Sequence, residues 1–220
     1  ADGTLTADTV LTLVNALYLK ASWAEPFEEA ATEDGPFTRA DGSEVTVPFL
    51  DGAGDASARG EHWVGAANDY VGGLRAQLIL PDEGHMDEAL ADLPALFAAF
   101  EQRAGPGGPL ALPRFETRYA EELSPALQAL GLTAPYERGG LLGIAADDRL
   151  VLTKVVHETF LAVDEEGTEA AAATAAAFDI TSAPIDEPVP VVLDRPFVLR
   201  ILDPASGATL FLGLIGDPTA

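Results

Sequence analysis

Short apolar segments with strand-like alternation dominate the chain and predict mostly β-strands. An evenly filled apolar run at 10–20 predicts a strand buried on both faces, since an amphipathic helix would show polar gaps. Asn15 interrupts this run, and a buried amide needs a partner, so a polar group should meet it from a neighbouring strand. Further strands are expected at 37–39, 45–50, 74–80, 110–115, 150–163 and, around a turn at 204–207, within 189–215.

Two segments have helical character, and one stretch reads as a loop. Apolar residues recur at helical spacing across 85–103, before the breaker Gly105-Pro106-Gly107-Gly108. A second helix should begin at Ser124 as N-cap, with Pro125 in its first turn, and end at Gly131. Residues 51–62 are rich in Gly, Ala and Asp and predict a loop. The chain is therefore expected to be mixed α and β, with strands prevailing and no internal repeat.

Composition excludes several functional classes. The 220 residues are 48% hydrophobic and 22% charged, as in globular proteins. Acidic residues outnumber basic ones 36 to 12, and the net charge of -24 argues against binding nucleic acid or an anionic membrane surface. The absence of Cys excludes disulfides, zinc–thiolate sites and a Cys nucleophile. No apolar run reaches the roughly 18 residues of a membrane span.

The segment 164–183 carries the most information. Its Ala-rich composition is compatible with a helix or a flexible linker, but its alternation favours a strand. Counted in twos from Thr168, one face carries Phe178 and Ile180, and the other carries Glu169 and Asp179. Gly167 stands at its start as a possible pivot, and every amide before Pro184 is free to join a β-ladder. The segment could therefore be a helix or loop in one state and a strand in another.

Ordered motifs along nearly the whole chain give it a specific resemblance. They run in this order: 13–20 with Trp23 and Phe27; 78–84; 112–115 with Leu123, Leu127 and 130–131; 156–157; 165–174; and 191–201 with its core Asp194, Arg195, Pro196 and Phe197. In this order they resemble the C-terminal part of a serpin, a member of the serine-protease-inhibitor family. The resemblance implies an α+β serpin fold, with several β-sheets, helices and an exposed reactive-centre loop at about 164–190. Residues 1–220 would form a single incomplete serpin domain that lacks the N-terminal helical portion, exposes apolar sheet surface and does not inhibit alone.

The resemblance implies a suicide substrate rather than an enzyme. A serine protease would cleave the loop and form an acyl-enzyme, and the cut loop would insert into the main sheet before deacylation. No cofactor or metal is expected, and the protein should be a monomer; the family favours an extracellular location. The hinge that starts insertion would comprise Glu165, Glu166, Gly167, Thr168, Glu169, Ala170, Ala171, Ala172, Ala173 and Thr174.

Two ways of locating the cleaved bond give positions about four residues apart. Counting from Glu165 with the family's spacing gives Thr181–Ser182, which we prefer, with Ile180–Thr181 as its neighbour. Counting back from Pro196-Phe197 gives a bond near Ile185–Asp186. Thr or Ile before the bond favours an elastase-like or subtilisin-like target. A trypsin-like target is disfavoured because no Lys or Arg lies between Lys154 and Arg195.

Three further residues receive roles from the resemblance. Asn15 and His157 would meet by a hydrogen bond on strands that flank the gap admitting the loop, and Trp23 would lie where the loop first enters. A structural role alone, as satisfied core polar residues, is the alternative for Asn15 and His157. The other two histidines, His62 and His85, are expected to be surface residues.

Two other functional classes fit the sequence less well. A non-inhibitory serpin-like carrier or chaperone usually has bulky, charged or proline residues in the hinge, whereas Ala170 to Ala173 are all small. A serine hydrolase would need a nucleophile beside His157, yet the chain has no G-x-S-x-G elbow, and His157 is expected to be buried within a strand. The sequence therefore favours an inhibitor.

Overall fold

The computed structural model describes residues 11–168 and 187–219, which fall into two compact units. Unit 1 contains 1–19 and 117–161, and unit 2 contains 20–116 and 162–220. The hinge residues from Glu169 to Thr174 and the candidate reactive bonds within 180–182 and at 185–186 lie outside the described residues. Strands prevail in both units, as the sequence predicts.

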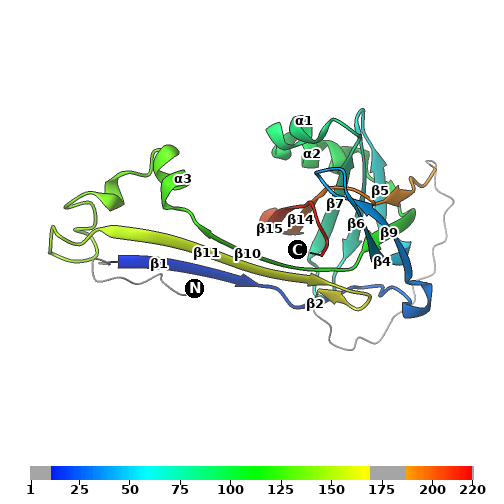
Figure 1. Cartoon of the computed structure of the whole chain (residues 1–220), viewed down its shortest axis with the longest axis horizontal. Coiled ribbons are helices and arrows are strands. Elements are labelled where there is room, and N and C mark those ends of the chain that lie inside the picture. Colours follow the sequence, from blue (N-terminus) through cyan, green and yellow to red (C-terminus); the bar gives the residue numbers. More distant parts are fainter. Residues whose placement is uncertain (1–10, 169–186, 220) are drawn as a thin grey trace. The chain divides into compact units, whose positions relative to one another are not determined.

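Unit 1 is built on a three-stranded sheet with the order β1 (Leu11–Tyr18), β11 (Leu152–Val163) and β10 (Phe115–Glu122) (Figure 1). β1 and β11 run parallel, and their register places Asn15 opposite His157. The predicted strand at 10–20 is confirmed, but its burial on both faces is wrong. Leu13 is 56% exposed and Val14 is 59% exposed, because no described residue covers either face of β1 there.

One helical turn of unit 1 is tied to β11. Helix α3 (Ser124–Ala129) is followed by Gly131, whose φ of +96° needs a glycine, and by the short η2 (Ala134–Tyr136). The N-cap prediction is wrong by one residue, since Leu123 occupies that position. The Ser124 hydroxyl instead accepts a hydrogen bond from the Val155 amide at 3.0 Å. It therefore joins the helix to the sheet.

Unit 2 contains a six-stranded and a four-stranded sheet (Figure 1). The six-stranded sheet has the order β15 (Ala208–Ile215), β14 (Phe197–Asp203), β7 (Arg75–Pro81), β6 (Trp63–Asp69), β5 (Ala56–Arg59) and β8 (Gly105–Pro106). The four-stranded sheet has the order β13 (Val191–Val192), β9 (Pro109–Pro113), β4 (Glu44–Ala53) and β3 (Glu33–Thr38). A short 3-10 turn, η1 (Glu29–Ala31), precedes β3, and β2 (Ala21–Ser22) pairs with β12 (Gly167–Thr168).

Helices α1 (Met86–Ala91) and α2 (Leu93–Arg103) pack on the six-stranded sheet (Figure 1). Phe97 and Phe100 of α2 join a buried cluster with Trp63, Ile79 and Val198 of the sheet. Burying such side chains contributes about 1.5–3 kcal/mol each, which makes this contact a main source of the unit's stability. None of the helices within 11–168 and 187–219 is long and apolar enough to cross a membrane.

Two predictions for unit 2 need correction. The helix expected over 85–103 is divided, because the Asp92 side chain caps a new helix at the Ala95 amide and Pro94 follows in its first turn. The loop expected at 51–62 contains the end of β4 and all of β5. Its small residues suit close packing in a sheet but give no apolar alternation.

Candidate functional site

A tight turn follows β11 and aims the chain toward β2. The Asp164 carboxylate accepts hydrogen bonds from the amides of Glu166 (3.0 Å) and Gly167 (3.1 Å). Gly167 has a φ of +150°, and a Cβ at this position would lie 2.3 Å from the Ala21 carbonyl oxygen. Only glycine fits both demands. The predicted pivot is therefore a position of close backbone approach.

Thr168 is already part of a β-ladder and is completely buried. β12 pairs antiparallel with β2, and Thr168 lies opposite Ala21. Its hydroxyl is 2.8 Å from the Tyr70 hydroxyl, and Thr168 is 0% exposed. Burial raises the pKa of Tyr70 well above its usual range, and the hydrogen bond with Thr168 opposes this only in part. Tyr70 is therefore a neutral partner for Thr168.

Trp23 holds both the turn and Tyr70. It is 1% exposed, and its ring stacks on Tyr70 with centroids 4.3 Å apart. The indole N–H donates to the Asp164 carbonyl at 3.0 Å, and the Trp23 amide donates to the Glu166 carbonyl at 2.9 Å. Trp23 therefore fixes the segment at which the predicted hinge begins.

Replacing Trp23 with Phe should destabilise this turn without removing its apolar support. The stacked aromatic ring is retained, but the Asp164 carbonyl loses its indole donor. Leaving a buried acceptor without a partner costs about 1–2 kcal/mol. Urea unfolding should show a loss of that size, and an unchanged free energy of unfolding would contradict the role of the indole N–H.

Glu165 is a buried carboxylate with two donors. Glu165 is 5% exposed. Its Oε1 accepts hydrogen bonds from the Thr32 hydroxyl, at 2.7 Å, and from Nη2 of Arg114. Burial raises the pKa of Glu165, but the hydrogen bonds from Thr32 and Arg114 outweigh it and leave the pKa below its usual value. Glu165 therefore stays ionised at neutral pH. Its carboxylate connects the segment after β11 to Thr32, before β3, and to Arg114, after β9.

Asn15 and His157 are brought together within unit 1. The Asn15 Nδ2 amide lies 2.9 Å from Nδ1 of His157, which accepts its hydrogen bond. The polar partner expected for Asn15 is present, on the neighbouring strand as predicted. The expected burial is wrong, since Asn15 is exposed and His157 is half-buried in the described residues.

The motif at 194–197 has a structural position in unit 2. Arg195 pairs with the Asp194 carboxylate at 3.0 Å and donates to the Pro81 carbonyl at 3.1 Å. The Asp194 carbonyl accepts from the Thr38 amide at 2.8 Å, and Phe197 is fully buried at the start of β14. These contacts join the ends of β3, β7 and β14.

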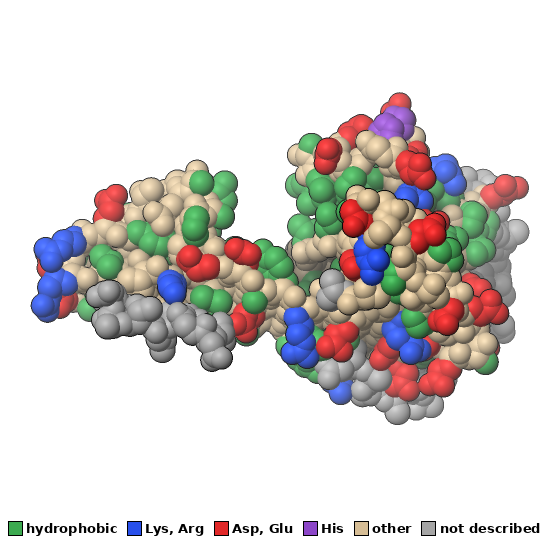
Figure 2. All heavy atoms as spheres, in the orientation of Figure 1, with side chains coloured by type: hydrophobic (Ala, Val, Ile, Leu, Met, Phe, Trp, Pro, Cys, Tyr) green, Lys and Arg blue, Asp and Glu red, His purple; other side chains and the backbone are tan. Residues whose placement is uncertain are grey.

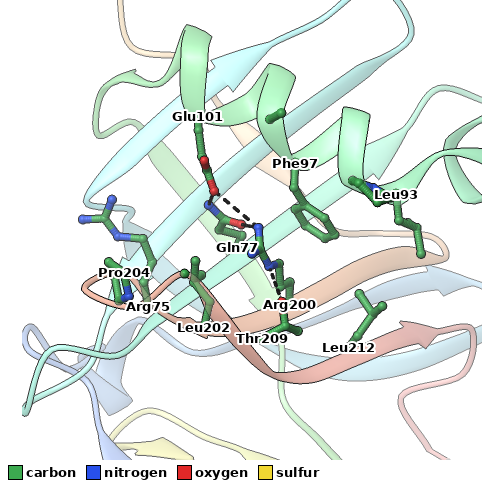
Figure 3. Close-up of a pocket in the computed structure, with 13 residues that line it drawn as sticks. Arg75, Gln77, Leu93, Phe97, Glu101, Arg200, Leu202, Pro204, Thr209 and Leu212 are labelled. Carbon is green, nitrogen blue, oxygen red and sulfur yellow. Dashed lines mark hydrogen bonds and ion pairs between the residues drawn. The ribbon is translucent and has the colours of Figure 1, made fainter.

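Unit 2 also contains a cavity of about 590 Å³ between α2 and strands β7, β14 and β15 (Figure 3). Arg200 points into it but is engaged by Glu101 and Gln77 at 3.3 Å each, and by Thr209 at 2.9 Å. Arg75, at its rim, pairs with the Asp69 carboxylate outside the cavity at 2.6 Å. The residues that line this cavity include no histidine, serine or cysteine.

Comparison with known proteins decides the family. Residues 1–218 match the family model described as serpin (serine protease inhibitor). The chain belongs to the serpin family. Serpin-Z2A of Oryza sativa subsp. japonica is 33% identical over the whole chain, and alpha-1-antitrypsin of Meriones unguiculatus is 32% identical over 98% of it.

Solved serpin structures agree with this fold. A complex of thyroxine-binding globulin with thyroxine has a TM-score of 0.83 and 26% identity over 98% of this chain. The thermophilic serpin tengpin in its native state has the same score and identity over 97%. The serpin fold predicted from the sequence is confirmed. The chain spans 62% of Serpin-Z2A, 53% of the Meriones protein and 59% of the thyroxine-binding globulin chain.

Sequence reasoning missed the residues that hold the predicted hinge. Tyr70, Thr32 and Arg114 receive no role from local patterns, although Arg114 lies within the motif at 112–115. Their partners are 98, 133 and 51 residues away along the chain. The only available signal was that Glu165 and Thr168 are polar residues at the end of a buried strand.

Proposed function

We propose that this serpin inhibits serine proteases as a suicide substrate, through cleavage of the loop at about 164–190 and insertion of the cut segment as a new strand. The pairing of Gly167–Thr168 with β2 carries this proposal. In this pairing the segment after β11 turns back and lies antiparallel to β2, which supports its use as the start of a longer ladder. Further residues would extend that ladder one pair at a time.

The register of the inserted strand follows from this starting pair. Thr168 lies opposite Ala21, and each further residue would face one residue earlier along the chain. Continued without a bulge, six steps place Thr174 opposite Asn15. The strand would therefore run along β1 and separate it from β11, its present partner. The hydrogen bond between Asn15 and His157 would have to open in the process.

The composition of the loop suits this transition. Thr168, whose side chain is buried, sets the inward face, so every second residue after it would point the same way. Those residues are small up to Phe178, while Glu169 and Asp179 fall on the opposite face. Burying an unpaired charge would cost several kcal/mol, and this alternation avoids that cost.

The target and the cleaved bond are part of the proposal. We keep Thr181–Ser182 as the reactive bond, with Ile180–Thr181 and the region up to Ile185–Asp186 as alternatives. A Thr before the bond suits an elastase-like or subtilisin-like protease.

A carrier function has one supporting observation, the cavity in Figure 3, whose volume of about 590 Å³ suits a small ligand. Thyroxine-binding globulin, crystallised with thyroxine, is among the similar structures. The guanidinium groups of Arg75 and Arg200, however, already pair with carboxylates. An inhibitor therefore remains the better-supported function.

Incubation of the full-length protein with an elastase-like and a subtilisin-like protease tests the proposal. An inhibitor should give a covalent complex that survives SDS, and mass spectrometry of the released peptide should place the cut at Thr181–Ser182. Cleavage by both enzymes without any complex would overturn inhibition and favour the carrier. A cut at Ile185–Asp186 within a stable complex would correct only the bond.

A further inference from the structure

Two of the chain's three histidines lie together on unit 2, beside a glutamate. The rings of His62 and His85 stack with centroids 3.8 Å apart and planes 10° apart. Nδ1 of His85 is 3.0 Å from the Glu88 carboxylate, and one ligand atom from each of the three residues lies within 4.8 Å of the other two. Figure 2 shows histidine in purple at the surface next to acidic side chains in red.

We propose that His62, His85 and Glu88 form a binding site for a divalent transition-metal cation, with Zn²⁺ as the preferred ion. Two imidazole nitrogens and one carboxylate oxygen are a common protein ligand set for zinc, with water completing a tetrahedron. Imidazole ligands also select against Mg²⁺ and Ca²⁺, which prefer oxygen. The site would be independent of the loop that the inhibitory proposal uses.

Backbone contacts hold the two histidines in place. The Asp82 amide donates to the His62 carbonyl at 2.9 Å, and the His85 amide donates to the Asp82 carbonyl at 3.0 Å. Gly84, with a φ of +79°, makes the turn that places His85 directly before α1. The Ala89 amide then bonds to the His85 carbonyl at 3.0 Å, which fixes Glu88 near the imidazole. The ligands are therefore brought together by two linked turns and a helix.

Only small side-chain movements would close the site around an ion. Zinc–ligand bonds of about 2.0–2.1 Å require ligand atoms about 3.3 Å apart in a tetrahedron. The Glu88–His85 pair already meets this distance, and the most distant pair lies within 4.8 Å. The side chains of His62, His85 and Glu88 are 41%, 35% and 70% exposed, so they have room to rotate.

Additional carboxylates surround His62. Its Nδ1 is 4.0 Å from an Asp82 oxygen, and its Nε2 is 4.0 Å from a Glu61 oxygen. Whichever nitrogen binds the ion, the other faces a carboxylate that can orient the ring and increase its basicity. The surrounding negative charge attracts a divalent cation to this surface.

The bound ion would connect the turn between β5 and β6 to helix α1. The three ligands line a cavity of about 270 Å³, whose lining also includes Trp63, Ala89 and Leu96. Because an ion bound only by the folded state stabilises it, Zn²⁺ at about 100 times its dissociation constant should raise the folded-to-unfolded ratio about 100-fold.

Calorimetric titration of the full-length, untagged protein with ZnCl₂ after chelator treatment tests the site. We expect one saturable site, and NMR should show that two histidine ring signals shift while that of His157 does not. H62Q and H85Q should each weaken binding by more than about 100-fold, since even outer-shell changes weaken metal sites by 10–100-fold. E88Q should weaken it at least about 10-fold, whereas the neighbouring D87N should leave it unchanged.

Two outcomes would overturn the site. One is the absence of saturable binding by the wild-type protein. The other is binding that H62Q and H85Q leave unchanged, which would indicate non-specific association with surface carboxylates. All four substituted side chains are on the surface, so circular dichroism should confirm the same fold in each variant.

Discussion

Under the proposed inhibitory function, replacing Thr168 with Arg should convert the protein from an inhibitor into a substrate. Thr168 is fully buried against Tyr70, at the pair from which the inserted ladder would extend. A guanidinium at this position must either lose its hydration, at a cost of several kcal/mol, or force β12 out of its pairing with β2. Since about 1.4 kcal/mol is a tenfold change in rate, the fraction of cleaved protein that forms a covalent complex should fall at least about 100-fold.

Glu169→Arg is the matched control, because it introduces the same side chain one residue later, on the face predicted to point outward. It should leave most complex formation intact. Thr168→Val should also trap protease, since it keeps the volume and loses only the hydroxyl, at about 1 kcal/mol. Covalent complex on SDS gels gives the readout for all three variants. Efficient trapping by Thr168→Arg would show that the inward face has been assigned wrongly.

Replacing Glu165 with Arg should cause a large loss of stability. The substitution places a cation among Arg114 and Thr32, where the carboxylate now accepts two hydrogen bonds. Breaking a buried ion pair costs about 3–5 kcal/mol, and we expect the lower end because the Arg114 side chain is 45% exposed and partly screened. Urea unfolding of the full-length protein should show a loss of about 3 kcal/mol.

The charge swap separates this ion pair from simple loss of packing. Adding Arg114→Glu to Glu165→Arg restores opposite charges and should recover more than half of the lost free energy. Glu165→Gln keeps the shape and should lose less than Glu165→Arg. If the double variant is no more stable than the single one, the contribution of Glu165 does not come from its pairing with Arg114.

The pH dependence of Glu165 has a definite sign. The pKa of Glu165 in the folded state lies below its ordinary value of 4.5, so the folded protein binds fewer protons at this residue than the unfolded chain around that pH. The stability that Glu165 contributes is therefore complete above pH 4.5 and is lost as the pH falls through its folded pKa. In Glu165→Gln this part of the acid sensitivity should disappear.

Much of the architecture could be predicted because many strands are specified by the hydrophobic pattern of their own residues. The segments 74–80 and 150–163 are rich in Leu, Val and Ile, and the short strands expected at 37–39 and 45–50 pair as the hairpin of β3 and β4. β5 and β6 were missed because Ala, Gly and Ser fill much of them, and small residues give little contrast between faces. The division of the helix at Asp92 depends on a cap and a proline that the apolar spacing conceals.

The candidate site could be predicted only at residues that lie within the motifs shared with the family. The resemblance paired Asn15 with His157, and the structure brings them within 2.9 Å. The contacts of Thr168 with Tyr70 and of Glu165 with Thr32 were not foreseen, because they join segments far apart in sequence. The stacking of His62 on His85 is likewise invisible in the sequence, since His85 lies 23 positions after His62 and only two linked turns of the fold bring them together.

The central claim is that the cut loop becomes a strand of the sheet containing β1 and β11, and heat stability tests it most directly. The full-length protein should be cleaved once between 180 and 186 by a protease that does not remain bound, and its melting temperature compared with that of the intact protein. Insertion adds a full set of ladder hydrogen bonds and buries the small-residue face, so the cleaved form should melt at a clearly higher temperature. A cleaved form that melts at the same or a lower temperature would contradict loop insertion.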